Sequence, residues 1–452
     1  MANEFQKVLG FPSLLATAAG VFVASTTLVS LGQGVGVGGY SFIVAMFIAC
    51  TLMIFQAFSF SELSLMLPRA GTVSSYTEIA LGHFPAIVAT LSGYVIVQLL
   101  AGPAELSVVG IILNQLLFPG LSPKLIALMI LALFMVLNLL GVDVFADFQI
   151  VFTLIVLGSL CCVGAAGLMG HPDALPPQTM PPIGTATVLP LVALAVWCFI
   201  GVEFVCPLIE ESKNPTRHIP LAMIGGLVLM LVIQSVHALA AARYVPMAKL
   251  AGSPTPYLEI AMAVMGRAGY YWIGAMSFFA TGSIMNVLLA GVPRMLYGMA
   301  HAGQVPSLFK YLHPRFKTPW VGIVLLASAM ALQVLLGVSG TGTIVALIVA
   351  SAFSWLLAYM IVHIDLIVLR IKYPRLSRPF RTPGYPVPQI LGIAGTLYVM
   401  ANIFPDPVLK AQIYKYSLIF LGGTAVYAFL WCKFKMKKGF FRPEPYEEAL
   451  NE

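Results

Sequence analysis

The chain has 452 residues, of which 60% are hydrophobic and only 9% charged, and its mean hydropathy is +0.94. Soluble proteins usually carry about 25% charged residues, so this composition excludes an ordinary soluble domain and indicates one integral membrane domain over residues 1–452. The net charge of +7 does not indicate nucleic acid binding, because the basic residues lie mostly in loops of one side. The six cysteines have no metal-ligand spacing, and no nucleotide-binding glycine loop is present. We therefore expect no enzyme activity, no metal and no other cofactor.

Twelve apolar stretches are interpreted as membrane-spanning helices, which makes the fold class all-α. In chain order they are 11–32, 39–67, 85–118, 123–141, 147–169, 187–209, 219–242, 269–299, 319–338, 343–370, 387–405 and 413–432. Turn-rich loops are predicted at 32–39, 171–184, 252–256 and 378–388. The stretches at 85–118 and 269–299 exceed the length that a perpendicular helix needs, which predicts tilt or extension beyond the membrane.

The distribution of basic residues predicts the orientation. An even number of spans places both termini on the same side of the membrane. If that side is the inside, 18 of the 24 lysine and arginine residues lie in inner segments. Basic residues accumulate in cytoplasmic loops, so both termini are expected in the cytoplasm, with the chain in an inner or plasma membrane. The basic clusters at 370–381 and 433–438 are expected to contact anionic membrane lipids.

The first and sixth spans each contain a break. In the first, Ala18-Ala19-Gly20-Val21-Phe22 precedes Ser25-Thr26-Thr27, and in the sixth Gly201 is followed closely by Glu203. A buried carboxylate costs on the order of 2.5–3.5 kcal/mol unless it meets a partner or a watery cavity. The sixth-span break is therefore either a ligand or ion site, or a glycine kink with Glu203 bonded to a neighbour. Two broken helices five spans apart are typical of an inverted-repeat transporter with a midplane site. We expect Gly20 and Gly201 to lie in non-helical segments that face each other.

Other polar and aromatic residues within the spans have more than one interpretation. Glu105 follows Pro103 in the third span and is expected to bond the broken helices, to titrate, to meet an ammonium group, or to be a hydrogen-bonded structural acid. Trp197 stacks on a ligand, closes the site, or packs in the core or against lipid. Four later polar or aromatic residues line the cavity or join helices through polar contacts: Ser283, Asn286, Ser354 and Trp355.

Several spaced motifs occur in order over nearly the whole chain. They are Ala19-Gly20-Val21-Phe22, Ser61-Glu62-Leu63 with Pro68-Arg69-Ala70-Gly71, Gly201-Val202-Glu203, Lys213–Pro220, Arg294 with Tyr297, and Arg378–Gly384. Together they resemble the amino acid–polyamine–organocation superfamily of secondary transporters. The resemblance implies the LeuT-type fold, with inverted five-helix repeats at 11–169 and 187–370 and two additional C-terminal helices at 387–432. It also implies alternating access around the broken helices.

The resemblance implies an amino acid substrate, with its carboxylate near Ala18, Ala19 and Gly20 and its ammonium near Cys198, Phe199 and Ile200. The complete expected binding set is Ala18, Ala19, Gly20, Val21, Glu105, Trp197, Cys198, Phe199, Ile200, Gly201, Ser283 and Asn286. Glu203 is the expected proton carrier, with Glu105 next. A neutral substrate is favoured, because a distal ammonium group needs a third acid that the central spans do not offer.

One departure from the family pattern concerns coupling. Many proton-coupled members carry a lysine in the fifth helix, and Val156 stands at the position where we expect it. This absence resembles the exchangers for arginine and agmatine and for putrescine and ornithine. Proton-coupled symport of an amino acid is therefore the expected function, and exchange against a second amino acid or polyamine is the alternative. An amino acid sensor is a third hypothesis, but it lacks the added soluble domain that signalling requires.

Overall fold

The computed structural model describes residue 5 and residues 7–171, 181–337, 344–404 and 406–447, without the side chains of 344–348. In chain order its α-helices are α1 (Phe11–Gly20), α2 (Ser25–Gly38), α3 (Tyr40–Met66), α4 (Val73–Ala80), α5 (His83–Thr90), α6 (Val97–Leu116), α7 (Pro123–Leu139), α8 (Val142–Met169), α9 (Thr185–Val196), α10 (Pro215–Tyr244), α11 (Met247–Gly252), α12 (Pro256–His301), α13 (Trp320–Leu336), α14 (Ile344–Lys372), α15 (Val387–Ala401) and α16 (Pro407–Leu430). Short tighter or wider helical turns are η1 (Val21–Val23), η2 (Leu91–Ile96), η3 (Val202–Glu211), η4 (Ser307–Lys310) and η5 (Trp431–Met436).

Within the described residues, seven helices are long and apolar enough to cross a membrane. The pair α1–η1 and α2, which bends by 55°, forms an eighth span if it is counted as one. Four further predicted spans coincide with shorter apolar helices, namely α7, α9, α13 and α15. The chain is therefore an all-helical integral membrane protein, and α5 to α6 form one continuous element of 34 residues, as the long third stretch predicted.

The predicted loop at 32–39 is wrong, because α2 continues as a helix to Gly38 and turns only at Gly39, whose φ is +54°. Its glycines lie against neighbouring elements. A Cβ at Gly34 would collide with the Phe42 ring, and one at Gly36 would collide with the backbone of Ala251. Small residues let helices approach closely in apolar surroundings. Glycines that suggest a turn in the sequence therefore serve helix packing here.

The boundaries of the other loops differ less from prediction. The chain leaves helical geometry between Gly252 and Pro256, as expected, but α12 then begins at Pro256 and is interrupted only at Gly266, where φ is +66°. The loop predicted at 378–388 ends when α15 begins at Val387. In the loop predicted at 171–184, residues 172–180 lie outside the described residues.

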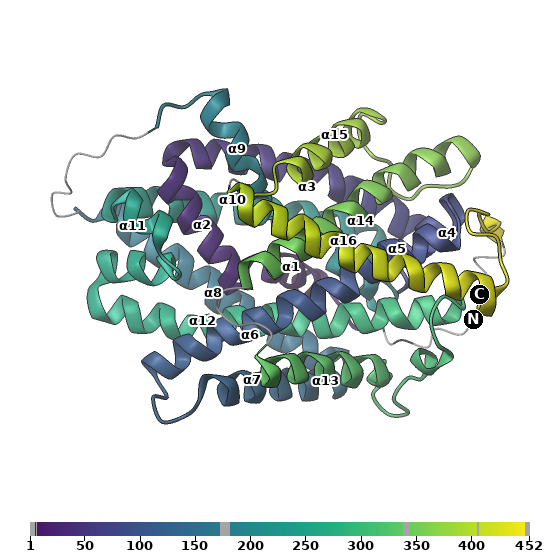
Figure 1. The fold of residues 1–452 in the computed structure, drawn as a ribbon, viewed down its shortest axis with the longest axis horizontal. Helices are drawn as coiled ribbons and strands as arrows, with labels where there is room; N and C mark the ends of the chain where they lie inside the picture. Colours follow the sequence, from purple (N-terminus) through teal and green to yellow (C-terminus); the bar gives the residue numbers. More distant parts are fainter. Residues whose placement is uncertain (1–4, 6, 172–180, 338–343, 405, 448–452) are drawn as a thin grey trace.

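The long helices run along the long axis of the molecule, and α1 lies in the middle of the bundle (Figure 1). The α1 helix contacts α8, α10 and η3, while α8 also packs against α10 and α12. Both termini lie at the same end of the bundle (Figure 1). This arrangement buries the broken part of the first span on all sides.

The N-terminal segment is bound to η3 and α12. Leu9 pairs with the end of η3, since its N–H donates to the Glu211 carbonyl at 2.9 Å and its carbonyl accepts from Lys213 N–H at 3.0 Å. The buried Arg294 of α12 donates to both carboxylate oxygens of Glu211, at 2.9 and 2.8 Å. The Phe5 ring lies 5.9 Å from the Arg294 guanidinium carbon. The N-terminal segment thus links the second half of the sixth span to α12.

The C-terminal segment 437–447 docks on the turn between α4 and α5. Phe84 N–H donates to the Phe440 carbonyl at 3.1 Å, and Glu444 N–H donates to the Glu78 carbonyl at 3.0 Å. The Glu444 carboxylate lies 2.7 Å from Nε2 of the buried His83 and 2.6 Å from Nζ of Lys438. Burial alone would raise the pKa of Glu444, but the hydrogen bonds from Lys438 and His83 outweigh it and lower this pKa below its ordinary value of 4.5.

We predict that Glu444→Gln loosens this segment at neutral pH. A carboxylate with a lowered pKa stabilises the folded contact above about pH 4.5, and this contribution is lost as the pH falls through the lowered value. Hydrogen–deuterium exchange of residues 437–447, normalised to the intrinsic rate at each pH, should be faster in the variant at pH 7. The difference from the parent should shrink towards pH 4. Equal exchange at pH 7 would contradict the role given to Glu444.

Candidate functional site

The first span is broken after α1. Gly20 keeps helical dihedral angles and is the last residue of α1, so the expectation that Gly20 itself is non-helical is wrong. The break lies at Ala24, where ψ of 147° separates η1 from the first turn of α2. Glycine is needed at position 20 for packing, because a Cβ there would lie 2.1 Å from the Gln149 amide nitrogen.

The sixth span is broken at Gly201, as predicted. The chain leaves α9 at Val196, makes turns to Gly201, and continues as the tighter helix η3. Gly201 has a φ of +109°, a conformation that side chains with a Cβ rarely adopt. A Cβ there would lie 2.3 Å from Cγ1 of Val21 and 3.2 Å from the indole ring of Trp355. The two broken spans therefore touch through Gly201 and Val21.

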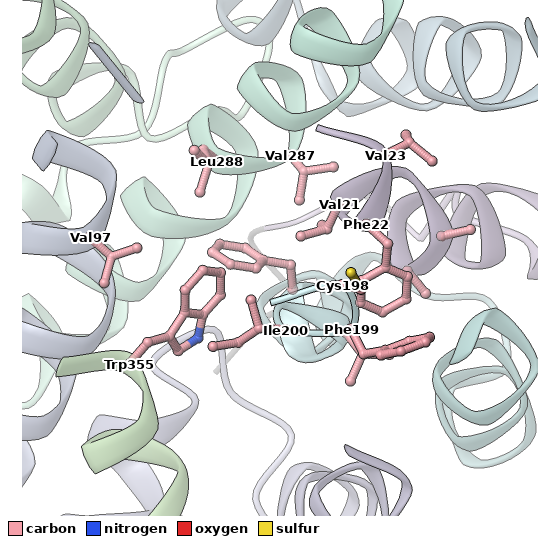
Figure 2. Close-up of a cluster of buried hydrophobic side chains, with 14 of the residues drawn as sticks. Val21, Phe22, Val23, Val97, Cys198, Phe199, Ile200, Val287, Leu288 and Trp355 are labelled. Atoms are coloured by element: carbon pink, nitrogen blue, oxygen red, sulfur yellow. The ribbon is translucent and has the colours of Figure 1, made fainter. Parts of the chain in front are cut away.

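A small cavity of about 20 Å³ lies at these breaks. Figure 2 shows Val97, Ile200, Leu288 and Trp355 around it, with Val21 close by. The complete lining is Val21, Ala24, Thr26, Thr27, Val97, Ala101, Glu105, Trp197, Ile200, Ile284, Met285, Leu288 and Trp355. This volume holds about one water molecule, so a larger ligand requires side chains to move. The lining is mostly apolar, and its polar side chains gather where Thr26, Thr27 and Glu105 meet.

Glu105 caps the helix that follows the first break. Its carboxylate oxygens accept from the backbone N–H of Ser25 at 2.7 Å and of Thr26 at 3.2 Å, and from the Thr281 hydroxyl at 2.8 Å. A carboxylate at a helix N-terminus satisfies unpaired N–H groups and interacts favourably with the helix dipole. Of the interpretations left open by the sequence, the bond to a broken helix is the one observed here. No acceptor for the next N–H, that of Thr27, is found in the part of the chain that is described.

Glu203 lies behind the cavity wall and is not among the lining residues. It is fully buried, and its carboxylate accepts from Trp355 Nε1 at 2.6 Å and from the Tyr359 hydroxyl at 2.5 Å. The same hydroxyl accepts from the Gly201 N–H at 2.9 Å. Glu203 therefore connects the sixth-span break to α14, and Trp355 and Tyr359 are the partners that this buried carboxylate needs.

An uncharged polar network holds the other side of the first break. Gln149 of α8 donates to the Ala16 carbonyl at 3.2 Å and to the Ser283 hydroxyl at 2.8 Å. Ser283 donates in turn to the Gly20 carbonyl at 3.0 Å, and Asn286 donates to the Gln149 side-chain oxygen at 3.1 Å. The carbonyl end of α1 is thus joined to α8 and α12 through amides and hydroxyls.

Only part of the expected binding set borders the cavity. Val21, Glu105, Trp197 and Ile200 line it. Ser283 and Asn286 belong to the Gln149 network instead, and five more expected residues are packed nearby without lining it: Ala18, Ala19, Gly20, Cys198 and Phe199. Gly201 shapes the break itself.

Sequence reasoning missed Thr26, Thr27, Val97 and Met285 as lining residues. The spacing of Val97, Ala101 and Glu105 at every fourth residue was the available signal, since such residues share one helix face. Thr26 and Thr27 directly follow the break. Trp355, considered from the sequence as one of several options, does line the cavity. Within the described residues no cluster of three or more His, Cys, Asp or Glu side chains is placed to hold a metal.

A helical membrane bundle with two broken spans that meet at a small, mostly apolar cavity is typical of membrane transporters. The chain matches the amino acid permease family over residues 9–430 and belongs to it. This family also lies within the superfamily that the motifs resemble. The family membership points to transport rather than catalysis.

Individual known proteins agree with this assignment. The chain is 25% identical to the branched-chain amino acid permease BcaP of Bacillus subtilis (strain 168), over 89% of each chain. It is 29% identical to the methylthioribose transporter of the same organism, over 88% of this chain and 86% of the relative. Its fold is similar to that of a Na⁺-coupled sialic acid symporter in a substrate-bound outward-open state, with a TM-score of 0.54, 12% identity, and coverage of 88% of this chain and 89% of that one.

We predict that Gly20→Ala disrupts the site through the Gln149 network. Its Cβ would collide with the Gln149 amide and the Ser283 hydroxyl, and overpacking of this kind costs about 1–3 kcal/mol. The midpoint of thermal unfolding in detergent should fall. Gly225→Ala is the matched control, because its Cβ has only Leu15 near it, at 3.8 Å, so its midpoint should stay or rise. Equal midpoints for the two variants would contradict the packing role of Gly20.

Proposed function

We propose that the protein is a secondary active transporter that moves a neutral amino acid across the membrane by alternating access. The contact between Gly201 and Val21 beside the small cavity carries this proposal, because it brings both broken spans together at one point. Membership of the amino acid permease family supports an amino acid as the substrate. The similarity to the branched-chain amino acid permease supports a substrate whose side chain is uncharged.

We further propose the complete topology that the sequence predicts. Twelve spans form inverted repeats at 11–169 and 187–370 with additional helices at 387–432, in a single domain. The helices α7, α9, α13 and α15 supply the four spans that are shorter than the rest. The basic segments lie at the cytoplasmic face of an inner or plasma membrane, together with both termini. The N-terminal and C-terminal segments lie at the same end of the bundle, which supports placing both on one side of the membrane (Figure 1).

The substrate's charged groups are proposed to bind at the two breaks. Cys198 O accepts from Gln234 at 3.3 Å, whereas no donor to the carbonyls of Phe199 and Ile200 is found among the described residues. These two carbonyls and the Glu105 carboxylate suit the ammonium group. The N–H of Thr27, at the positive end of α2, suits the carboxylate. This placement shifts the expected carboxylate position from Ala18–Gly20 to the start of the next helix, because the α1 end presents carbonyls instead of N–H groups.

We propose that Glu203 carries the coupled proton, with Glu105 second, since Glu105 already holds three donors that cap α2. Exchange against another amino acid or polyamine is the alternative mode. In either mode the protein needs no nucleotide or metal, and its partners are the substrate, the proton or counter-substrate, and the surrounding lipid.

Glu203→Gln tests the coupling. The amide still accepts from Trp355 Nε1 but cannot exchange a proton, so proteoliposome uptake of leucine should no longer follow an imposed pH gradient. Exchange of internal for external leucine should remain measurable. If uptake by the variant follows the pH gradient as the parent does, the proton role moves to another group. Uptake that requires sodium at constant pH would identify sodium coupling instead.

Competition tests the charge of the substrate. Unlabelled alanine, leucine, lysine, arginine, putrescine and methylthioribose should be compared as inhibitors of labelled leucine binding to the purified protein. Leucine and alanine should compete more strongly than the cations, because an unpaired charge buried in this apolar lining costs several kcal/mol. Displacement at micromolar lysine, arginine or putrescine with no effect of alanine would overturn the neutral assignment. Glu105 would then be the first acceptor to consider for a side-chain ammonium.

A further inference from the structure

Trp355 differs from the other tryptophan at the cavity in how it is held. Its side chain is 3% exposed, and its Nε1 donates to Glu203 at 2.6 Å. Its ring also packs edge-to-face against Tyr94 and Phe204, with centroids 6.2 and 5.8 Å away. Trp197 is only partly buried and packs against Ala104. Trp355 is thus the rigid aromatic wall of the cavity.

The N–H edge of this indole is turned away from the space that a ligand would enter. Glu203 takes the N–H and is not itself a lining residue, so the ring presents carbon atoms to the cavity. The neighbouring lining residues are Val97, Ala101, Ile200, Met285 and Leu288, which are all apolar. The polar lining residues are Thr26 and Thr27 in the first turn of α2, and Glu105 of α6, whose carboxylate binds the start of α2. The cavity therefore has an apolar part and a polar part.

The hold on the ring extends beyond one hydrogen bond. Tyr359 donates to the second oxygen of Glu203 and accepts from the Gly201 N–H, so the carboxylate is itself fixed against the break. Since the cavity of about 20 Å³ must enlarge for a ligand, the less constrained Trp197 and the flexible Met285 are the side chains that give way. The clamped Trp355 then sets the limit of the apolar part.

We propose that Trp355 determines which substrate side chains are accepted, and that Glu203 and Tyr359 act as positioning residues for its indole. The favoured substrates have an apolar side chain that ends against this ring. This inference rests on the proposed amino acid transport and adds the class of side chain and the residue that selects it.

The test measures the dissociation constants of alanine, leucine and phenylalanine for the purified full-length protein by calorimetry. Trp355→Ala should weaken leucine binding by about tenfold relative to alanine and shift the preference towards phenylalanine, because the wall is removed. Trp272→Ala is the matched control. Trp272 also donates its N–H to a side chain, Ser159, but is 53% exposed and lies outside the cavity lining. It should leave the selectivity ratios unchanged.

The positioning role has its own readout. Trp355→Phe keeps an aromatic ring without the N–H, and Glu203→Ala removes the acceptor of that N–H. Each variant should therefore relax the selectivity, which means that the dissociation constants of leucine and alanine become more similar. Their double variant should relax it no further than either alone, because both break one contact. Glu203→Gln retains an acceptor for the indole and should keep the parent ratio. Additive effects of the two changes, or a relaxed ratio in Glu203→Gln, would overturn the positioning role.

The outcomes separate this inference from the proposed function. If the parent binds none of the three amino acids, the proposed function fails and the specificity role fails with it. If the parent binds leucine and the Trp355→Ala variant keeps the parent ratios of dissociation constants, only the role of Trp355 is overturned. If the alanine variant does not fold, Trp355→Phe is used in the same comparison.

Discussion

The structure depends on satisfying backbone groups where two helices are broken in apolar surroundings. An unpaired N–H in such surroundings costs several kcal/mol, so some of the backbone groups freed at each break are paired by side chains of the protein. Glu105 is the partner at the start of α2, and the Tyr359 hydroxyl is the partner at Gly201. Glu105 and Glu203, which binds Tyr359, are therefore next to the breaks for a structural reason, before any role in transport is considered.

The carbonyl end of α1 is held without a charge. The resemblance to proton-coupled transporters suggests a lysine on the fifth span, and Val156 stands at the position expected for it. The observed donor is Gln149, seven residues earlier and therefore about two turns along the same face of α8. An amide with hydroxyl partners stays neutral over the physiological pH range, so this link is not expected to titrate. Coupling by a proton then has to use a carboxylate, which favours Glu203 or Glu105 over the fifth span.

The sequence predicted the structural features that depend on composition, and it did not predict those that depend on contacts between distant residues. Apolar length located the long spans, and Gly201 indicated its break because glycine readily adopts the φ of +109° found there, which other residues rarely adopt. Glycine also led to the wrong prediction of a loop at Gly34 and Gly36, which are helical and allow close packing. At Gly20 the sequence indicated a break, but the side chains of Gln149 and Ser283 require a glycine within the helix. The clamp on Trp355 joins residues 152 positions apart, so no local pattern contains it.

Under the proposed coupling, the geometry of Glu203 determines where its proton acts. Trp355 Nε1 is a donor only, so the oxygen that accepts from it keeps its role in either protonation state. A proton therefore goes to the oxygen that faces Tyr359, and the Tyr359 hydroxyl must then accept from Glu203 and turn its own hydrogen elsewhere. That hydroxyl also accepts from the Gly201 N–H, so the change reaches the sixth-span break directly. Protonation of Glu203 thus changes the hydrogen bonding of the backbone at the break, while the hydrogen bond from Trp355 Nε1 to Glu203 is retained.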